Sequence, residues 1–238
     1  MPNQNTLDPD LTPALPAHTP VNIETKGILF DNDGVIVSSI GSVNRCWRKW
    51  AQHYGVPVAE DFQIEHGTRA VDVMQKLVPG INVVEGLKLI EDMELEDVAD
   101  LTVLPGVKDL LESLPMDRWA IVSSATYRLL IGRLKVAKLP IPERIISGDR
   151  VVNGKPHPEP YIKGAELIHA APKDCIVIED APSGVRAGKA AGCRVLGVVG
   201  THSADELRAA GVEWVVETLE HVKAEVIENG LRLRLETI

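Results

Sequence analysis

We predict an α/β fold, in which a Rossmann-like core with a parallel sheet carries an inserted, all-helical cap domain. Two observations support this prediction. From residue 104 onward, short apolar segments typical of buried strands alternate with stretches of helical periodicity, as in a right-handed parallel α/β sheet. Residues 37–103 instead carry apolar residues at helical spacing and hardly any strand pattern.

The predicted elements follow in chain order. Residues 1–21 are rich in proline and polar residues and lack a core pattern, so we interpret them as a disordered tail. The core then comprises residues 22–36 and 104–238, and the cap comprises residues 37–103. We predict core strands at residues 119–123, 145–147, 175–179, 194–199 and 214–216. Residues 231–235 alternate between leucine and arginine with period two, which predicts an additional edge strand.

Composition limits the possible partners. The chain has 238 residues and a net charge of −9, and this charge argues against nucleic acid and anionic membranes, which favour a basic surface. Its apolar runs fall far below the ~20 residues of a membrane-spanning helix. Cys46, Cys175 and Cys193 are odd in number and irregularly spaced, so buried free thiols in a reducing cytosol explain them better than disulfides or zinc. We therefore expect a cytoplasmic monomer or weak dimer whose partner is a small molecule.

Two carboxylates end the first core strand. Asp31 and Asp33 follow the apolar residues 27–30, and Asn32 stands between them. Because strand side chains alternate, the two carboxylates share one side while Asn32 faces away, and Gly34 permits a sharp turn. One carboxylate can then attack a phosphorus atom while the other transfers a proton. An ordinary strand-to-turn junction uses the same residue types, so this motif alone leaves both interpretations open.

A second acidic pair, Glu179 and Asp180, closes another apolar strand far downstream. In open parallel sheets, ligands bind at the carboxyl ends of strands near a topological switch point, so we expect the two pairs to converge there. Two carboxylates about 4 Å apart repel by roughly 4 kcal/mol at an effective dielectric constant near 20. A cluster of four therefore requires a bound cation, and oxygen-only ligands indicate Mg²⁺.

Two further segments supply groups that phosphate chemistry needs. The strand near residue 120 is expected to run into a helix whose first hydroxyl and free backbone N–H groups can hold phosphate oxygens. Simple helix capping by Ser124 or Thr126 explains the same residues and stays open. Lys155 lies in a loop stiffened by prolines, so its ammonium group is held in place and can neutralise both a phosphate and the acidic cluster.

The order of these motifs, Asp-x-Asp-Gly, Ser, Lys and Glu-Asp, resembles the haloacid dehalogenase superfamily of aspartate-nucleophile phosphatases. Within it, the chain is similar to the small sugar-phosphate branch that includes the β-phosphoglucomutases, and above all to glycerol-phosphate and 2-deoxyglucose-6-phosphate phosphatases. The stretches that carry the resemblance are residues 104–107, 119–124, 154–161, 179–184 and 187–193. Two segments of the cap, 47–48 and 66–69, add to it, and the whole resemblance spans residues 23–216.

The resemblance implies a catalytic role for four positions. Asp31 is the nucleophile that becomes an aspartyl phosphate, and Asp33 is the general acid and base. Ser124 orients the phosphate, in preference to Ser123, because it directly precedes the small residue of the family's Ser-small-Ser/Thr pattern. Lys155 offsets the negative charge.

The resemblance also implies the ligands of the expected Mg²⁺. These are the carboxylates of Asp31 and Asp180 and the backbone carbonyl of Asp33. Glu179 is either a further ligand or a partner of one.

Substrate contacts are expected from the cap and from neighbours of the catalytic residues. In the cap, His66 and Arg69 lie on either side of Gly67, which permits a tight turn that projects both side chains toward the core. A surface or helix-capping role for His66 and a solvated side chain for Arg69 are the alternatives. In the core, we assign Asn32 and Ala125, neighbours of the predicted nucleophile and of the phosphate-orienting hydroxyl, to the substrate-binding set.

Three functions remain open at this point. The first is a Mg²⁺-dependent phosphatase that hydrolyses a small sugar or polyol phosphate monoester through an aspartyl phosphate. The second is a sugar phosphomutase of the β-phosphoglucomutase type, which uses the same motif residues but keeps its phosphoenzyme long enough for the sugar to turn around. The third is a non-catalytic protein that binds a phosphorylated ligand.

Overall fold

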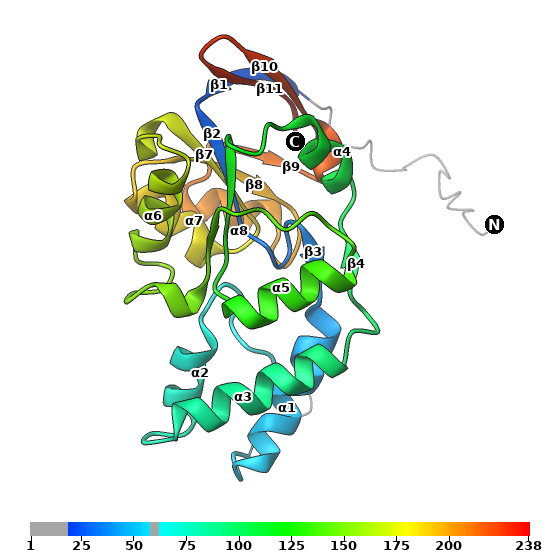
Figure 1. Ribbon diagram of the computed structural model, residues 1–238, viewed down its shortest axis with the longest axis vertical. Coiled ribbons are helices and arrows are strands. Elements are labelled where there is room, and N and C mark those ends of the chain that lie inside the picture. Colours follow the sequence, from blue (N-terminus) through cyan, green and yellow to red (C-terminus); the bar gives the residue numbers. More distant parts are fainter. Residues whose placement is uncertain (1–18, 58–61) are drawn as a thin grey trace, which may run out of the picture.

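A six-stranded parallel sheet forms the centre of the computed structural model, which describes residues 19–57 and 62–238 (Figure 1). Its strands are β2 (Gly27–Phe30), β5 (Trp119–Val122), β6 (Ile145–Ile146), β7 (Cys175–Glu179), β8 (Arg194–Val198) and β9 (Trp214–Val216). They lie in the order β6-β5-β2-β7-β8-β9, and each neighbouring pair is parallel. The core strands predicted from the sequence are all present, each to within one residue at either end. The predicted fold class is confirmed.

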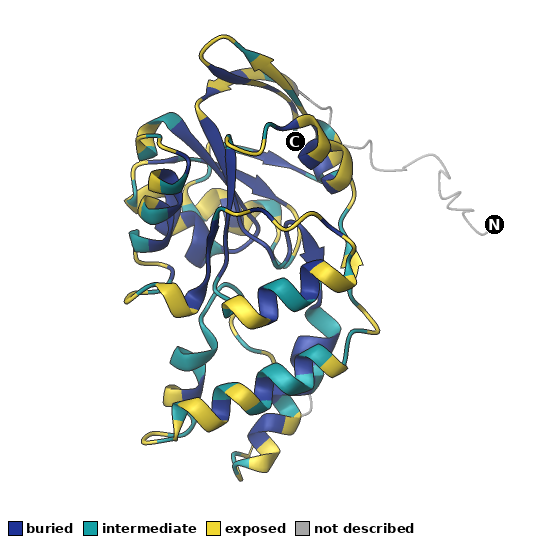
Figure 2. Ribbon diagram, viewed as in Figure 1, coloured by how far each residue is buried: buried dark blue, intermediate teal, exposed yellow. Residues whose placement is uncertain are grey.

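Helices cover both faces of this sheet. They are α4 (Val107–Ser113), α5 (Tyr127–Val136), α6 (Glu159–Leu167), α7 (Pro182–Ala190) and α8 (Ala204–Ala210), with 3-10 turns η1 (Gly148–Arg150), η2 (Pro172–Asp174) and η3 (Leu219–His221). Ile28 and Phe30 of β2 lie in one apolar cluster with Leu130 of α5. Leu29, between them, lies in a second cluster with Tyr161 of α6. Both faces are therefore buried, which explains why the core strands are continuously apolar (Figure 2).

Among the described residues, three helices form the cap: α1 (Ile40–His53), α2 (Ala70–Leu77) and α3 (Val83–Glu96). They pack around the buried side chains of Trp47, Trp50, Met74 and Ile90. The chain enters the cap after β3 (Val37–Ser38) and returns through β4 (Thr102–Val103), and these two-residue strands pair antiparallel. This pairing, which the sequence pattern does not show, brings the two connections side by side.

A separate antiparallel sheet lies at the end of the molecule opposite the cap (Figure 1). Its strands, in the order β1-β11-β10, are β1 (Thr19–Thr25), β11 (Gly230–Thr237) and β10 (Val222–Ile227). Leu231, Leu233 and Leu235 of β11 are buried in the core, and the residues between them are exposed. The alternation in this segment therefore does mark a strand with one buried face.

Two sequence-based predictions are corrected by this sheet. Residues 231–235 form a middle strand rather than an edge strand, because β1 and β10 supply partners on both sides of β11. The predicted tail 1–21 is too long, because residues 19–21 pair with β11 at the start of β1. Its other residues, 1–18, lie outside the described residues.

Two expectations from composition can be compared with the described structure. None of the described helices combines the length and the apolar character needed to cross a membrane. Cys46, Cys175 and Cys193 are free and buried, as predicted. Burial raises the pKa of their thiols to about 11, about 12 and about 12, so these thiols are protonated at neutral pH.

Candidate active site

Three buried carboxylates meet at the carboxyl ends of two adjacent strands. Asp31 follows β2, Glu179 ends β7 and Asp180 follows it, and β2 pairs with β7 in the sheet. Oxygens of the three carboxylates lie within 4.8 Å of one another. The exposed fractions of the three residues are 5%, 0% and 1%, so their charges are almost completely removed from water.

A buried ammonium group binds two of these carboxylates. Lys155, in the loop before α6, donates to Asp31 Oδ1 and to Glu179 Oε1, each at 2.6 Å. Burial lowers the pKa of Lys155, but the charges of Asp31 and Glu179 outweigh burial and raise that pKa overall. The ammonium group therefore stays charged and ties the ends of both strands together.

The cluster nevertheless keeps an excess of negative charge. Burial raises the pKa of Asp31 well above its usual value; Lys155 opposes this shift, and Glu179 and Asp180 add to it. Burial, followed by the charge of Glu179, raises the pKa of Asp180 to about 7. Three carboxylates surround one ammonium group, which leaves two negative charges when all three are ionised. A divalent cation would balance this excess.

The donor atoms fit Mg²⁺, because they are all oxygens. Glu179 is already saturated by protein groups: Oε1 accepts from the ammonium group and from Tyr161 Oη at 2.7 Å. Its Oε2 accepts from the backbone N–H groups of Asp180 and Ala181 at 3.1 and 3.2 Å. The carboxylates of Asp31 and Asp180 are therefore the stronger candidates for metal ligands, with Glu179 as the residue that holds the ammonium group beside them.

Asp180 is oriented by Thr201 and by a glycine. Thr201 donates to Asp180 Oδ2 with its backbone N–H at 3.1 Å and with its hydroxyl at 2.5 Å. Gly34 has a φ of +92°, and a Cβ at this position would lie 1.9 Å from the same oxygen. Gly34 therefore serves two purposes: it turns the chain after β2, as predicted, and it leaves room for the carboxylate.

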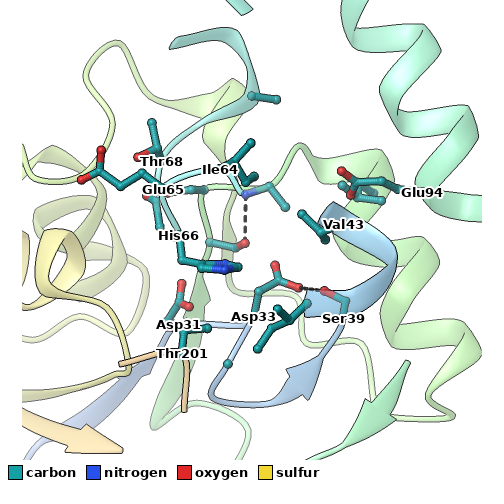
Figure 3. Close-up of a pocket in the computed structure, with 18 of the residues that line it drawn as sticks. Asp31, Asp33, Ser39, Val43, Ile64, Glu65, His66, Thr68, Glu94 and Thr201 are labelled. Atoms are coloured by element: carbon teal, nitrogen blue, oxygen red, sulfur yellow. Dashed lines mark hydrogen bonds between the residues drawn. The ribbon is translucent and has the colours of Figure 1, made fainter. Parts of the chain in front are cut away.

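Asp33 does not join the cluster, which corrects the expectation that four carboxylates converge. Its Oδ1 accepts a hydrogen bond from Ser39 Oγ at 3.1 Å and from Arg133 Nη1 at 2.6 Å. Figure 3 shows its side chain turned toward Ser39, in a pocket that Asp31 also lines. Asp33 thus lies beside the cluster but is bound to a different cation.

The turn after β2 keeps Asp31 and Asp33 on one side, as the alternation of strand side chains predicts, because both line the pocket and Asn32 does not. Pairing of β2 with its neighbours ends at Phe30, and the backbone N–H groups of residues 35–37 donate to the carbonyl of Asn32. The side chain of Asn32 is fully buried, and its amide has no hydrogen-bond partner among the described residues. Asn32 is not among the residues that line the pocket, so the structure does not bring this predicted substrate-binding side chain to the site.

The predicted phosphate-binding segment follows β5 and lines the pocket. Ser124 Oγ donates to the carbonyl of Gly67 in the cap at 2.6 Å, and Ser123 Oγ accepts from the N–H of Ala125 at 3.1 Å. Helix α5 is capped by Thr126, whose hydroxyl accepts from the N–H of its third residue. The capping alternative therefore applies to Thr126, and Ser123 and Ser124 both line the pocket.

The cap contributes His66 to the pocket, as predicted (Figure 3). Burial, followed by the charge of His202, lowers the pKa of His66, with Asp33 acting in the opposite direction. Its carbonyl accepts from Ser183 Oγ at 3.3 Å, which joins the segment before α2 to the first turn of α7. Gly67 has a φ of +81°, so the predicted tight turn is present.

Arg69 is held away from the pocket. Its Nε and Nη2 each donate to the carboxylate of Asp72 at 2.8 Å. Its Nη1 donates to the carbonyls of Val151 and Val152 at 3.1 and 3.0 Å. The structure thus shows Arg69 binding the cap to a loop of the core, and it does not bring the guanidinium group to the residues that line the pocket.

Sequence reasoning missed Arg133 and Glu94, two of the charged residues that line the pocket. Arg133 of α5, which binds Asp33, also donates through Nη2 to Glu94 Oε2 of α3 at 2.5 Å. Burial raises the pKa of Glu94 to about 7, against the opposing charge of Arg133, and Asp33 adds to the rise. Neither residue belongs to a motif, and an acidic run such as that around Glu94 is typical of a solvated helix face.

Comparison with known proteins identifies the family. Residues 28–198 match the model of the haloacid dehalogenase-like hydrolases. The chain belongs to this family. The resemblance predicted from the motif order is thereby confirmed, and the arrangement of Asp31, Lys155 and Asp180 can be interpreted as that of a haloacid dehalogenase-like hydrolase.

Relatives within the family have names that specify phosphorylated polyols. Hexitol phosphatase A of Escherichia coli is 37% identical over 210 residues, which cover 86% of this chain and 96% of that protein. Glycerol-1-phosphate phosphohydrolase 1 of Saccharomyces cerevisiae is 31% identical over 216 residues, which cover 86% of each chain. A β-phosphoglucomutase structure from Clostridium difficile has a TM-score of 0.71 at 23% identity and covers 84% of this chain and 93% of that one. The last comparison shows the shared fold alone.

Proposed function

We propose that the protein is a Mg²⁺-dependent phosphatase that hydrolyses a small sugar or polyol phosphate monoester through an aspartyl phosphate on Asp31. The observation that carries this proposal is the buried carboxylate of Asp31, bonded to Lys155 at 2.6 Å and clustered with Asp180 at the end of the sheet. The names of the relatives, hexitol phosphatase A and glycerol-1-phosphate phosphohydrolase 1, support the choice of substrate class.

In the first step, a carboxylate oxygen of Asp31 attacks phosphorus and the bond from phosphorus to the alkoxide oxygen breaks. A phosphate monoester is a dianion, so an anionic nucleophile can approach it only where positive charge screens the repulsion. Lys155 provides part of that charge. Mg²⁺, held by the carboxylates of Asp31 and Asp180 and the backbone carbonyl of Asp33, would screen the remaining charge of the phosphate.

Asp33 serves as the acid in this step and as the base in the next. In its protonated form it gives a proton to the departing alkoxide, and it then takes a proton from the water that hydrolyses the aspartyl phosphate and frees Asp31. The bonds from Ser39 and Arg133 both fall on Oδ1, which leaves Oδ2 for this proton transfer.

The phosphate oxygens would be held at the start of α5. The hydroxyl of Ser124 and the N–H of Ala125 line the pocket there, and each now has a protein partner that a phosphate oxygen can replace. Beyond the phosphate, the pocket presents apolar groups such as Val43 and Trp47 together with polar groups such as His66. This mixed lining suits a small polyol or sugar.

Phosphate release from a panel of sugar and polyol phosphates, with and without Mg²⁺, tests the proposal. We expect turnover of a hexitol phosphate or glycerol phosphate that chelator abolishes and Mg²⁺ restores. Full activity in chelator would refute the dependence on Mg²⁺. The absence of phosphate release from every member of the panel would refute the proposed phosphatase activity. Conversion of glucose 1-phosphate to glucose 6-phosphate with a bisphosphate primer, without phosphate release, would identify a mutase instead.

A further inference from the structure

The contact between the cap and the core contains two arginines of one helix. Arg128 and Arg133 both lie on α5 and both bind acidic residues of α3 in the cap. Arg128 is half exposed, and it donates to Glu91 at 3.0 Å and to Asp92 at 2.6 Å. Salt bridges of a half-exposed arginine contribute little to stability because water competes for its guanidinium group. The Arg128 pairs therefore hold the surface of the interface together without reaching the pocket.

Arg133 differs from Arg128 in burial and in its second partner. The side chains of Arg133 and Glu94 are 5% and 4% exposed, so water cannot replace either partner of this pair. The other terminal nitrogen of Arg133 donates to Asp33 Oδ1, again at 2.6 Å. One guanidinium group therefore bridges a carboxylate of the cap and the carboxylate predicted to carry protons during catalysis.

We propose that Arg133 is a positioning residue that couples the cap to Asp33. With Glu94 bound to Nη2, the plane of the guanidinium group is fixed, and the donor Nη1 fixes Asp33 Oδ1 in turn. This inference rests on the proposed function, because it assigns Arg133 the task of directing the remaining oxygen of Asp33 toward the substrate when the cap is docked.

The shape of the side chain matters for this role. A guanidinium group is planar and presents its two terminal nitrogens at a fixed angle, so it can hold two carboxylates in a defined relation. A lysine at the same position has the charge but a single nitrogen on a flexible stem. Arg133→Lys therefore separates the effect of charge from the effect of the bridge.

The kinetics of p-nitrophenyl phosphate show whether Asp33 is correctly held. Its leaving group departs without a proton, so Asp31 can still be phosphorylated when Asp33 is misplaced, but hydrolysis of the aspartyl phosphate still needs Asp33 as a base. We expect Arg133→Met to raise the initial burst of p-nitrophenol toward one equivalent per site. The steady-state rate should then fall at least about tenfold, a part of the ~10²–10⁴-fold contribution typical of general acid–base catalysis. On a polyol phosphate both steps should slow.

Matched variants at the same interface provide the controls. Arg128→Met removes the half-exposed arginine of the interface and should change neither the burst nor the steady-state rate by more than about twofold, because salt bridges of an exposed side chain are weak. Arg133→Lys should behave like Arg133→Met. Glu94→Gln should show a smaller effect in the same direction, and the double variant Glu94→Gln, Arg133→Met should be no slower than Arg133→Met alone, because both act through one bridge.

Several results would overturn the proposal. One is a folded Arg133→Met enzyme with wild-type burst and rates; another is a loss confined to the phosphorylation step, which would place Arg133 at the phosphate. Wild-type kinetics in the Arg133→Lys enzyme would also refute the coupling. So would rate losses of Glu94→Gln and Arg133→Met that simply add in the double variant. If Arg133→Met does not fold, the burst and the steady-state rate of Arg133→Lys and Glu94→Gln test the proposal instead. A wild-type protein that hydrolyses neither substrate would instead refute the proposed function itself.

Discussion

Replacement of Lys155 by methionine tests the electrostatic centre of the site. Methionine keeps most of the length and apolar volume of the side chain but removes the two bonds of 2.6 Å to Asp31 and Glu179. Because the Lys155 side chain is 1% exposed, no water replaces the lost ammonium group. Removal of one partner of a buried ion pair typically lowers the free energy of unfolding by about 3–5 kcal/mol. That is a large share of the ~5–15 kcal/mol that stabilises a typical domain.

The same change should impair catalysis. The approach of the Asp31 carboxylate to a dianionic phosphate loses one of its screening charges, and removal of a single electrostatic contact of this kind typically lowers kcat by about 10²–10³-fold. Urea unfolding followed by circular dichroism measures the first effect, and phosphate release at saturating substrate measures the second. Mg²⁺ should recover part of the lost stability, because a divalent cation replaces some of the missing positive charge.

Lys163→Met is the matched control. Lys163 lies on α6 close in sequence to Lys155, but it is 39% exposed and pairs with Glu159 at 2.8 Å on the surface. Exposed pairs contribute ~0–1 kcal/mol, so this variant should unfold at nearly the wild-type urea concentration and turn over normally. Equal urea midpoints for the two variants, or a Lys155→Met enzyme within threefold of the wild-type kcat, would refute the interpretation of Lys155 as the counter-charge of the cluster.

Three other predictions concern the acids and the turn. Asp31→Asn should abolish turnover while the protein stays folded, because an amide keeps the shape but cannot form the acyl phosphate; residual turnover would exclude Asp31 as nucleophile. Gly34→Ala should weaken Mg²⁺ binding and activity, because its Cβ would lie 1.9 Å from Asp180 Oδ2. Gly55→Ala is the control: Gly55 has a φ of +68° and open space around it, so this change should lower only the stability of the protein. Isothermal titration with Mg²⁺ distinguishes the two. Because the pKa of Glu94 rises from 4.5 to about 7 on folding, its contribution to stability is present below pH 4.5 and is lost as the pH rises to about 7. Glu94→Gln should remove this pH dependence of the free energy of unfolding, which is on the order of 3 kcal/mol across that range. Unfolding measured at several pH values tests this, and an unchanged dependence on pH would contradict the raised pKa of Glu94.

The parts of the fold that could be predicted are those with local patterns. The strands of the parallel sheet are short apolar runs because both faces of the sheet are covered, as Ile28 and Leu29 illustrate by packing in opposite clusters. The sheet β1-β11-β10 could not be assembled in the same way. Its strand β1 pairs with β11 across most of the length of the chain, from Ile23 to Leu233 for example, and no local pattern encodes such a partner.

The candidate site shows the same division between local and distant signals. Asp31, Lys155 and Asp180 were identifiable because each ends a strand or stands in a stiffened loop with a recognisable neighbour sequence. Arg133 and Glu94 were not, because a charged residue in a helix is normally solvated, and only the packing of α3 against α5 removes these two from water.

The two carboxylates of the motif after β2 have separate cationic partners, and this separation has a chemical consequence. Asp31 is bonded to Lys155, from the loop before α6, whereas Asp33 is bonded to Arg133, from the middle of α5. Two strongly interacting carboxylates titrate as a pair, so that neither has a pKa of its own. Distinct cations on distinct elements allow one carboxylate to act as a nucleophile and the other to carry protons. In the proposed mechanism only the second carboxylate is linked to the cap, through Glu94, so docking of the cap acts on proton transfer and leaves the nucleophile in place.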